Sequence, residues 1–349
     1  MHKPTARRLI WWCALAACVV ALVFAARGLL FRTSPPLTLS GQTMGTAYTI
    51  KMVAPPASVD VAALNSQVRQ TLDRIEGRMS TYRADSELSR LNSHCGGEWF
   101  DVSLETARVI QLAAEIGHLT GGAFDVTVGP LVNLWNFGPG GNLPDRIPDD
   151  GQIARAKSRV GFDAVEVRLS PPAVSKRRED LYIDLSGIAK GYAVDQIAER
   201  LDQSGIENYL VEIGGELRAT GHNHRGRPWQ VAVESPVAEE RSIQRVVPIQ
   251  GLAMATSGDY RNYFEKDGVR YSHIIDPRSG RPVAHRLASV TVLSASCTRA
   301  DALATALLVL GPEAGYDLAL KEGIAALFVV RSDVGFVEKA TPSFTEVLQ

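Results

Sequence analysis

The sequence predicts an α+β fold: a single large domain in which a mostly antiparallel sheet packs against helices, behind an N-terminal membrane anchor. Two observations predict this class. Strand-like segments outnumber helical ones, and the two kinds do not follow one another in the strict order of a parallel βαβ sheet. The charged and apolar N-terminus stands apart, and beyond it no repeat, charge run or low-complexity break separates further domains.

The N-terminus has the pattern of an export signal. Lys3, Arg7 and Arg8 precede an apolar run over residues 9–26. Its length is on the order of the ~20 residues that span a bilayer as a helix. Positive charges before such a run keep the N-terminus in the cytoplasm and place the rest of the chain outside.

Two interpretations of this anchor remain open. Residues 15–18, Leu-Ala-Ala-Cys, look like a bacterial lipoprotein cleavage site, at which Cys18 would become the lipidated first residue. Residues 19–24 are still apolar, where a lipoprotein usually turns polar, and this favours an uncleaved transmembrane anchor. Both attach the chain to a membrane, facing outward. The expected division is an anchor over residues 1–32, a linker over residues 33–38 and the folded domain over residues 39–349.

Helical spacing of apolar residues predicts the helices. Over residues 61–79, Val61, Leu64, Val68 and Leu72 share one face. Comparable spacing predicts further helices over residues 104–119, 188–201 and 299–310.

Short apolar or alternating segments predict the strands. The first, residues 43–53, alternates and stops before two prolines. The others are residues 164–169, 181–185, 209–213, 229–234, 253–257 and 288–293. Residues 269–282 predict a hairpin that turns at 276–280, and residues 136–151, rich in Gly, Pro and Asp, predict a long surface loop.

Composition and missing motifs exclude several functions. A formal net charge of −1 gives no excess of Lys and Arg, so no nucleic acid is expected as a partner. Neither GxxxxGK[ST] nor a GxGxxG after a strand occurs, which argues against P-loop and Rossmann sites. No zinc spacing occurs, and Cys95 and Cys297 are expected to be unpaired, buried thiols.

The first candidate site segment is residues 182–192, in which a strand runs through a Ser-Gly turn into a helix. The first turn of a helix has free N–H groups and suits an anion, and Lys190 adds a full positive charge. Asp184 stands where it can accept hydrogen bonds from a ligand. The alternative is an ordinary strand–turn–helix in which Ser186 caps the helix.

The second segment is residues 297–306, in which Asp301 and Thr305 are four apart and share one helix face. A carboxylate beside a hydroxyl suits a hard cation such as Mg²⁺, which prefers oxygen ligands. Taken alone, a plain helix capped by Thr298, with Asp301 in its first turn, explains the pattern better.

Other segments offer binding or proton transfer. Adjacent glycines in residues 120–130 let the backbone approach a ligand closely, or end a helix. Tyr82 lies in a polar turn and either stacks on a flat ring or closes a loop over the core. His273 is the best-placed general base. His222 and His224 have the spacing of a metal pair on a strand, but their neighbours favour a solvated loop.

Together these segments resemble the ApbE family of FAD:protein FMN transferases, from about Leu39 to the C-terminus. The segments that carry the resemblance are Met44-Gly-Thr, Met79-Ser-Thr-Tyr82, Gly122-Ala-Phe-Asp125, Asp184-Leu-Ser-Gly-Ile-Ala-Lys-Gly191, Gly214-Gly-Glu216, Ser257-Gly-Asp-Tyr260, His273-Ile-Ile-Asp-Pro277 and Thr298-Arg-Ala-Asp-Ala-Leu-Ala-Thr305.

The resemblance implies an enzyme that uses FAD as substrate and needs Mg²⁺. Such enzymes move the FMN half of FAD onto a Thr or Ser hydroxyl of a redox protein through a phosphoester bond and release AMP. It also implies partners, the acceptor subunits of Nqr- and Rnf-type redox complexes. With the anchor, this places the catalytic domain on the bacterial inner membrane, facing the periplasm.

The resemblance also implies roles for particular residues. An FAD pocket would be lined by Met44, Tyr82, Ala123, Phe124, Asp125, Asp184, Lys190 and Ile275. Mg²⁺ would be held by the backbone carbonyl of Gly187 and the side chains of Asp301 and Thr305. His273 would take the proton of the acceptor hydroxyl, with electrostatic help from Lys190.

Two other functions fit the same residues. One is an FAD pyrophosphatase, in which water replaces the acceptor and the products are FMN and AMP. The other is a non-catalytic flavin-binding lipoprotein, which would retain FAD and form no AMP.

Overall fold

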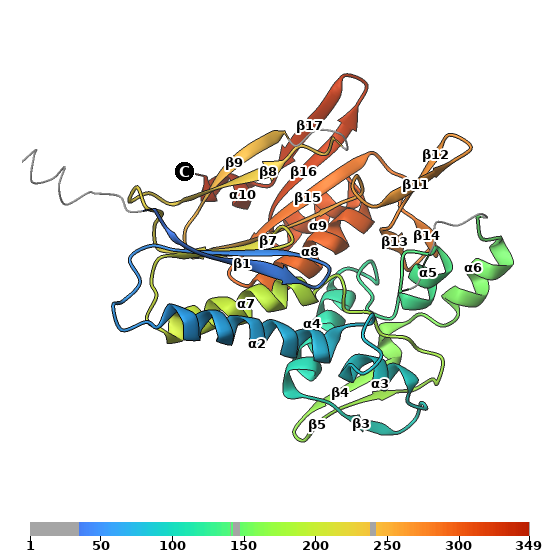
Figure 1. The fold of residues 1–349 in the computed structure, drawn as a ribbon. Helices are drawn as coiled ribbons and strands as arrows, with labels where there is room; N and C mark the ends of the chain where they lie inside the picture. The colour runs from blue at the N-terminus through green and yellow to red at the C-terminus, as the bar shows by residue number, and fades with distance from the viewer. Residues whose placement is uncertain (1–34, 140, 142–146, 238–241, 349) are drawn as a thin grey trace, which may run out of the picture.

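The structure, a computed structural model, describes residues 35–139, 141, 147–237 and 242–348. Its centre is an eight-stranded sheet in the order β1-β2-β6-β7-β10-β15-β16-β17, in which every neighbouring pair is antiparallel (Figure 1). The strands are β1 (Leu37–Thr43), β2 (Thr46–Met52), β6 (Tyr209–Ile213), β7 (Glu216–Thr220), β10 (Leu252–Gly258), β15 (Leu287–Ser294), β16 (Ala325–Ser332) and β17 (Gly335–Ala340). The predicted mixed fold with a mostly antiparallel sheet is therefore confirmed.

Helices cover one face of this sheet. The two that contact it most closely are α7 (Ala189–Gln203) and α8 (Cys297–Leu310), with α9 (Ala314–Lys321) beside α8. A second row, α2 (Val61–Met79) and α4 (Leu104–Leu119), packs against α7 and α8 (Figure 1). Strand β15 is buried along nearly its whole length, as expected for a central strand with both faces covered.

The opposite face is covered by a separate two-stranded ribbon and the last helix. The ribbon consists of β8 (Trp229–Glu234) and β9 (Ile243–Ile249), and the helix is α10 (Pro342–Val347). Trp229, Val247 and Phe344 from these elements bury against Leu217 and Met254 of the sheet. The sheet is thus the middle layer of the molecule.

Two smaller groups of elements complete the fold. One is the sheet β3-β5-β4, with β3 (Trp99–Asp101), β4 (Val165–Leu169), β5 (Pro172–Lys176) and the short helix α3 (Glu87–Ser93). The other contains α5 (Gly129–Leu134), α6 (Asp150–Lys157), β11 (Tyr263–Lys266), β12 (Val269–Ser272), β13 (Ile275–Asp276) and β14 (Arg281–Pro282), and a 3₁₀ turn, Phe162–Ala164, precedes β4.

Capping explains where the predicted helices begin. α2 and α4 coincide with the predicted ranges because Asp60 and Ser103 accept hydrogen bonds from the first-turn N–H groups. α8 begins two residues earlier than predicted because its N-cap is Ser296, whose hydroxyl accepts from the Arg299 N–H. Neither Thr298 nor Asp301 therefore caps this helix.

The predicted strand over residues 181–185 is wrong. This extended segment has no strand partner in the described residues; instead, the side-chain amide of Asn92 takes a partner's place. The Ile183 N–H donates to Asn92 Oδ1 at 2.7 Å, and Asn92 Nδ2 donates to the Ile183 carbonyl at 2.8 Å. The polar groups of the backbone are satisfied without a ladder.

The predicted hairpin over residues 269–282 divides into two. β12 forms an antiparallel hairpin with the preceding strand, β11. The turn residues Asp267 and Gly268 both have positive φ, as the favoured two-residue hairpin turns require. The turn at 276–280 joins only the short β13 and β14. The predicted surface loop is shorter than expected because α6 begins at Asp150.

Several expectations concern the N-terminus and the cysteines. The anchor over residues 1–32 lies outside the described residues, and β1 begins at Leu37, inside the expected linker. Within the part of the chain that the structure describes, no helix is both long and apolar enough to cross a membrane. Cys95 and Cys297 are unpaired, but Cys95 is exposed rather than buried.

Candidate active site

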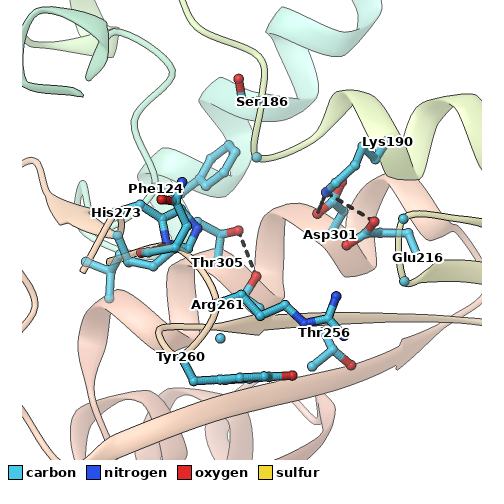
Figure 2. A pocket seen from close by; sticks show the side chains of 18 of the residues that line it. Phe124, Ser186, Lys190, Glu216, Thr256, Tyr260, Arg261, His273, Asp301 and Thr305 are labelled. Atoms are coloured by element: carbon cyan, nitrogen blue, oxygen red, sulfur yellow. Dashed lines mark hydrogen bonds and ion pairs between the residues drawn. The ribbon is translucent and has the colours of Figure 1, made fainter. Parts of the chain in front are cut away.

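A cavity of about 740 Å³ is lined by the start of α7, one side of α8, strands of the main sheet, the β8–β9 ribbon and several loops. All but one of the predicted site residues line it: Tyr82, Ala123, Phe124, Asp125, Asp184, Gly187, Lys190, His273, Ile275, Asp301 and Thr305. Residues far apart in the sequence are therefore brought to one place (Figure 2).

Met44 is the exception, since it is not among the residues that line the cavity. It occupies the tight turn between β1 and β2 with a φ of 48°, and its N–H donates to Glu76 Oε1 at 2.5 Å. Its side chain is partly buried against the main core. In the structure Met44 closes a hairpin and joins it to α2.

Asp301 and Thr305 face the cavity from α8, one helical turn apart. Asp301 is 2% exposed, and its Oδ2 accepts the Gly191 N–H at 2.9 Å. The Thr305 hydroxyl lies 3.0 Å from that of Ser257 on β10. A buried acid is costly unless it is paired, and here Oδ2 has the Gly191 N–H while Oδ1 has the Lys190 ammonium, 3.9 Å away.

Gly191 lets α7 approach α8, and Gly187 lies in the turn before α7. A Cβ at Gly191 would lie 2.4 Å from the Cys297 carbonyl oxygen and 2.8 Å from Asp301 Cβ. A Cβ at Gly187 would lie 3.6 Å from Thr305 Oγ1, which places this turn directly beside the hydroxyl. Any larger residue at position 191 would push the two helices apart.

The donor set at this point fits a hard cation. The described residues contain no group of three or more His, Cys, Asp and Glu side chains that could hold a metal ion. The predicted ligands are of another kind: the Asp301 carboxylate, the Thr305 hydroxyl and the Gly187 backbone carbonyl. Such an all-oxygen set suits Mg²⁺, which also keeps several waters and binds substrate phosphates.

Lys190 lies in the first turn of α7 between two buried carboxylates (Figure 2). Its Nζ is 3.1 Å from Glu216 Oε2 and 3.9 Å from Asp301 Oδ1. Burial lowers the pKa of Lys190, but Asp301 and Glu216 more than offset this, and the pKa lies above its ordinary value. Burial raises the pKa of Glu216, and Lys190 opposes that rise. Lys190 therefore stays charged.

His273 reaches the cavity from the segment between β12 and β13. Its Nδ1 lies 2.9 Å from the Asn262 carbonyl oxygen, which can only accept, so Nδ1 carries the proton. Nε2 is then the basic nitrogen. Burial lowers the pKa of His273, with a further lowering from Lys190 and opposition from the Asn262 carbonyl and Asp259. The imidazole is accordingly neutral near pH 7.

Asp125 has its carboxylate turned to its own loop. Oδ1 accepts from the Thr127 N–H at 2.7 Å and the Thr127 hydroxyl at 2.6 Å, and Oδ2 accepts from the Phe162 N–H at 3.1 Å. Burial raises the pKa of Asp125, although these hydrogen bonds oppose it. Asp125 thus shapes the loop that presents Ala123 and Phe124 to the cavity.

Asp184 and Tyr82 also line the cavity, and Asp184 lies beside the Asp125 segment, since its N–H donates to the Val126 carbonyl at 2.7 Å. Asp184 Oδ1 accepts from the Ser186 N–H at 2.8 Å and its hydroxyl at 2.5 Å, so Ser186 closes the turn and does not cap α7. Tyr82 is 69% exposed, which rules out the interpretation that it closes a loop over the core. Its ring is available to a flat ligand at the cavity wall.

The sequence analysis missed several residues of the cavity. Glu216 was noted only as part of a motif, and Ser257, Tyr260, Arg261 and Phe137 were given no role. For Glu216 a signal existed, since a carboxylate directly after two glycines and before an apolar strand is unusual. His222 and His224 lie outside the cavity, and His222 bonds to its own loop through Asn223.

The fold and the cavity can now be compared with known proteins. The model of the ApbE family matches residues 44–328. A protein of Vibrio cholerae named FAD:protein FMN transferase is 49% identical over 310 residues, covering 89% of this chain and 92% of that protein. A Haemophilus influenzae protein of the same name is 41% identical over 318 residues, covering 90% of this chain and 92% of its own length.

A solved structure agrees with these relatives. The flavin transferase ApbE from Vibrio cholerae superposes with a TM-score of 0.82 at 47% identity, covering 89% of this chain and 98% of that one. The chain has the fold of a flavin transferase. It belongs to the ApbE family.

Proposed function

We propose that this chain transfers FMN from FAD onto a Thr or Ser hydroxyl of a redox protein, forming a phosphoester and releasing AMP. One observation carries the proposal. A single cavity brings together the His273 imidazole, the side-chain oxygens of Asp301 and Thr305, and the exposed ring of Tyr82. The relatives named FAD:protein FMN transferase, which match nearly the whole chain, support it.

The transfer exchanges one phosphorus–oxygen bond for another. The acceptor oxygen attacks the phosphorus of the FMN half, and the bond from that phosphorus to the bridging oxygen breaks. AMP leaves with the bonding electron pair. The proton of the acceptor hydroxyl passes to His273 Nε2, the nitrogen that the Asn262 carbonyl leaves basic. A positioned base of this kind contributes a factor of ~10²–10⁴.

Asp301, Thr305 and the Gly187 carbonyl would hold Mg²⁺. When bound, the ion neutralises and aligns the phosphate oxygens of FAD. The charged Lys190, at the start of α7, adds to the stabilisation of negative charge on the pyrophosphate. Ala123, Phe124, Asp184 and Ile275 would surround FAD, with Tyr82 stacked on one of its rings.

We further propose a place and a partner for the enzyme. The positive and apolar N-terminus supports attachment to the bacterial inner membrane, with the catalytic domain facing the periplasm. Acceptor subunits of Nqr- and Rnf-type redox complexes on that side are the proposed partners. Replacing Cys18 by Ser distinguishes the two anchors: a lipid-linked mass on the wild type that the variant lacks identifies a lipoprotein.

One assay tests the activity. The full-length chain in detergent is incubated with FAD, Mg²⁺ and a periplasmic Rnf- or Nqr-type subunit, and the intact mass of the acceptor is measured. The expected result is a gain of one FMN. Asp301→Ala should abolish this gain, because it removes the charged ligand.

The other outcomes decide between functions. AMP and FMN in solution, with an acceptor of unchanged mass, would identify a pyrophosphatase. FAD retained without AMP would identify a flavin-binding protein. Full transfer by the wild type after removal of Mg²⁺ would contradict the metal assignment.

A further inference from the structure

Two buried carboxylates share one ammonium group at the floor of the cavity. Lys190 Nζ is closer to Glu216 Oε2, at 3.1 Å, than to Asp301 Oδ1, at 3.9 Å (Figure 2). Both acids are almost completely buried. With all three groups ionised the cluster carries one net negative charge, which a further cation would balance.

The turn between β6 and β7 is built to place Glu216 there. Gly214 and Gly215 both have positive φ, and a Cβ at Gly214 would lie 2.8 Å from Thr46 Cγ2. The Gly215 N–H donates to Glu212 Oε1 at 2.8 Å, which closes the turn. Burying a carboxylate costs several kcal/mol unless it is well paired. Because this turn places a carboxylate in a buried position at such a cost, we expect Glu216 to have a function.

The function of Glu216 follows from the two cations that compete for the Asp301 carboxylate. In the proposed function this carboxylate binds a cation, while the ammonium of Lys190 lies close enough to pair with the same oxygen. Two cations compete for one carboxylate, and at these distances in a poorly solvated site the competition is strong. Glu216 offers the Lys190 ammonium a second carboxylate that is nearer than Asp301.

We propose that Glu216 is a positioning residue that holds the Lys190 ammonium off Asp301. Asp301 is thereby left for the cation, and Lys190 is kept over the site of the pyrophosphate. This inference rests on the proposed function, since it takes Asp301 as a cation ligand. Glu216 acts through Lys190 and does not bind the cation itself.

Direct binding of Mg²⁺ tests the proposal. Mg²⁺ is titrated by calorimetry into the full-length chain in detergent, without FAD. Glu216→Gln keeps the size and one acceptor oxygen but removes the charge, so Lys190 should move to Asp301. We expect Mg²⁺ to bind about 10–100-fold more weakly, the usual effect of losing a residue that supports a ligand.

A matched control variant distinguishes a specific loss of Mg²⁺ affinity from a general loss of stability. Glu338→Gln removes the carboxylate of a partly buried ion pair with Arg245, and neither of these two residues lines the cavity. It should leave Mg²⁺ affinity unchanged. A fall in melting temperature for Glu216→Gln with unchanged Mg²⁺ affinity would overturn the proposal and leave Glu216 a purely structural role.

Combining Glu216→Gln with Lys190→Gln tests whether Glu216 affects Mg²⁺ binding through Lys190. In Lys190→Gln no ammonium can move to Asp301, so adding Glu216→Gln should weaken Mg²⁺ binding much less than it does in the wild type. An undiminished effect would contradict the proposal, because Glu216 would then act on the cation without Lys190.

These titrations are independent of the transfer assay. If the chain transfers no FMN but the affinities change as expected, the proposed function fails and the positioning role stands. If the wild type binds no Mg²⁺, the cation assignment fails, and the positioning role fails with it.

Discussion

At the scale of the residue, one hydrogen bond sets the direction of proton transfer. The Asn262 carbonyl accepts from both the backbone N–H of His273, at 3.0 Å, and its Nδ1, at 2.9 Å. The ring is thereby fixed in orientation and in tautomer, with Nε2 as the basic nitrogen. The base is prepared before any substrate arrives.

Replacing His273 by Asn should remove the base and leave the cavity intact. We expect the rate of FMN transfer to fall by ~10²–10⁴, because proton transfer in the rate-limiting step is lost. FAD should bind with nearly unchanged affinity, measured by fluorescence titration. A variant that transfers FMN at the wild-type rate would exclude His273 as the base.

The pH dependence of transfer follows from the same residue. Only neutral His273 accepts a proton, so the rate should rise with pH as the imidazolium deprotonates. Burial lowers its pKa, with charges from Lys190 and Asp259 acting in opposite directions. The rate should therefore reach half its plateau below the ordinary histidine pKa of about 6.5. A midpoint above that pH, in a profile of initial rates, would contradict the assignment.

Single residues also show where sequence reasoning stops. Asp301 and Thr305 could be paired from their spacing, but spacing could not tell a buried acid from a capping one. Asp125 was placed among the FAD-lining residues, whereas its carboxylate bonds mainly to Thr127 and Phe162. Such hydrogen bonds depend on the loop conformation, which no local pattern encodes.

At the scale of the element, α7 and α8 are joined by one carboxylate. Asp195 of α7 accepts from the Cys297 N–H at 3.0 Å, the Thr298 N–H at 2.9 Å and the Thr298 hydroxyl at 2.7 Å. It also accepts from Ser296 Oγ and pairs with Arg218. The free N–H groups at the start of α8 are satisfied by a neighbouring helix, which fixes Asp301 relative to Lys190.

Asp195→Ala should lower the free energy of unfolding by about 2–4 kcal/mol, because several buried donors lose a charged partner together. Denaturant unfolding of the full-length chain in detergent measures this. Asp202→Ala on the same helix is the control, since the Asp202 carboxylate accepts a hydrogen bond from a single side chain, the Tyr209 hydroxyl, among the described residues. Equal losses for the two variants would contradict a special role for Asp195.

Elements with strong local signals were predicted well. α2 and α4 have the predicted bounds because apolar spacing and capping residues agree. Residues 181–185 were mistaken for a strand because an apolar run does not reveal whether its partner is a strand or the Asn92 side chain. The β11–β12 hairpin was missed although Asp267-Gly268 is a strong turn signal.

At the scale of the whole molecule, the class of fold was predictable and the strand order was not. Strands β1, β7, β16 and β17 of the main sheet were missed; β1 and β17 are its two edges, whereas β7 lies inside it between β6 and β10. Pairing such as that of β2 with β6 depends on tertiary contacts across much of the chain. From the sequence, the cavity residues could be grouped only through resemblance to a family, since no local pattern brings Tyr82 to Asp301.

Ligands that bind the folded cavity should stabilise the whole domain. FAD with Mg²⁺ at a hundred times its dissociation constant should add about 2.7 kcal/mol to the free energy of unfolding. The melting temperature of the full-length chain in detergent should therefore rise with FAD concentration. Asp301→Ala, which loses the cation ligand, should show a smaller rise, and an equal one would separate the cation from FAD binding.

The pairing of β2 with β6 has a consequence for folding during synthesis. A ribosome makes the β1–β2 hairpin long before the strand that β2 pairs with, and α8, which carries Asp301, comes near the end of synthesis. Growing chains therefore hold unpaired strand edges and no flavin site. The cavity is therefore complete only after synthesis of the chain is nearly finished, so an unfinished molecule has no site for FAD.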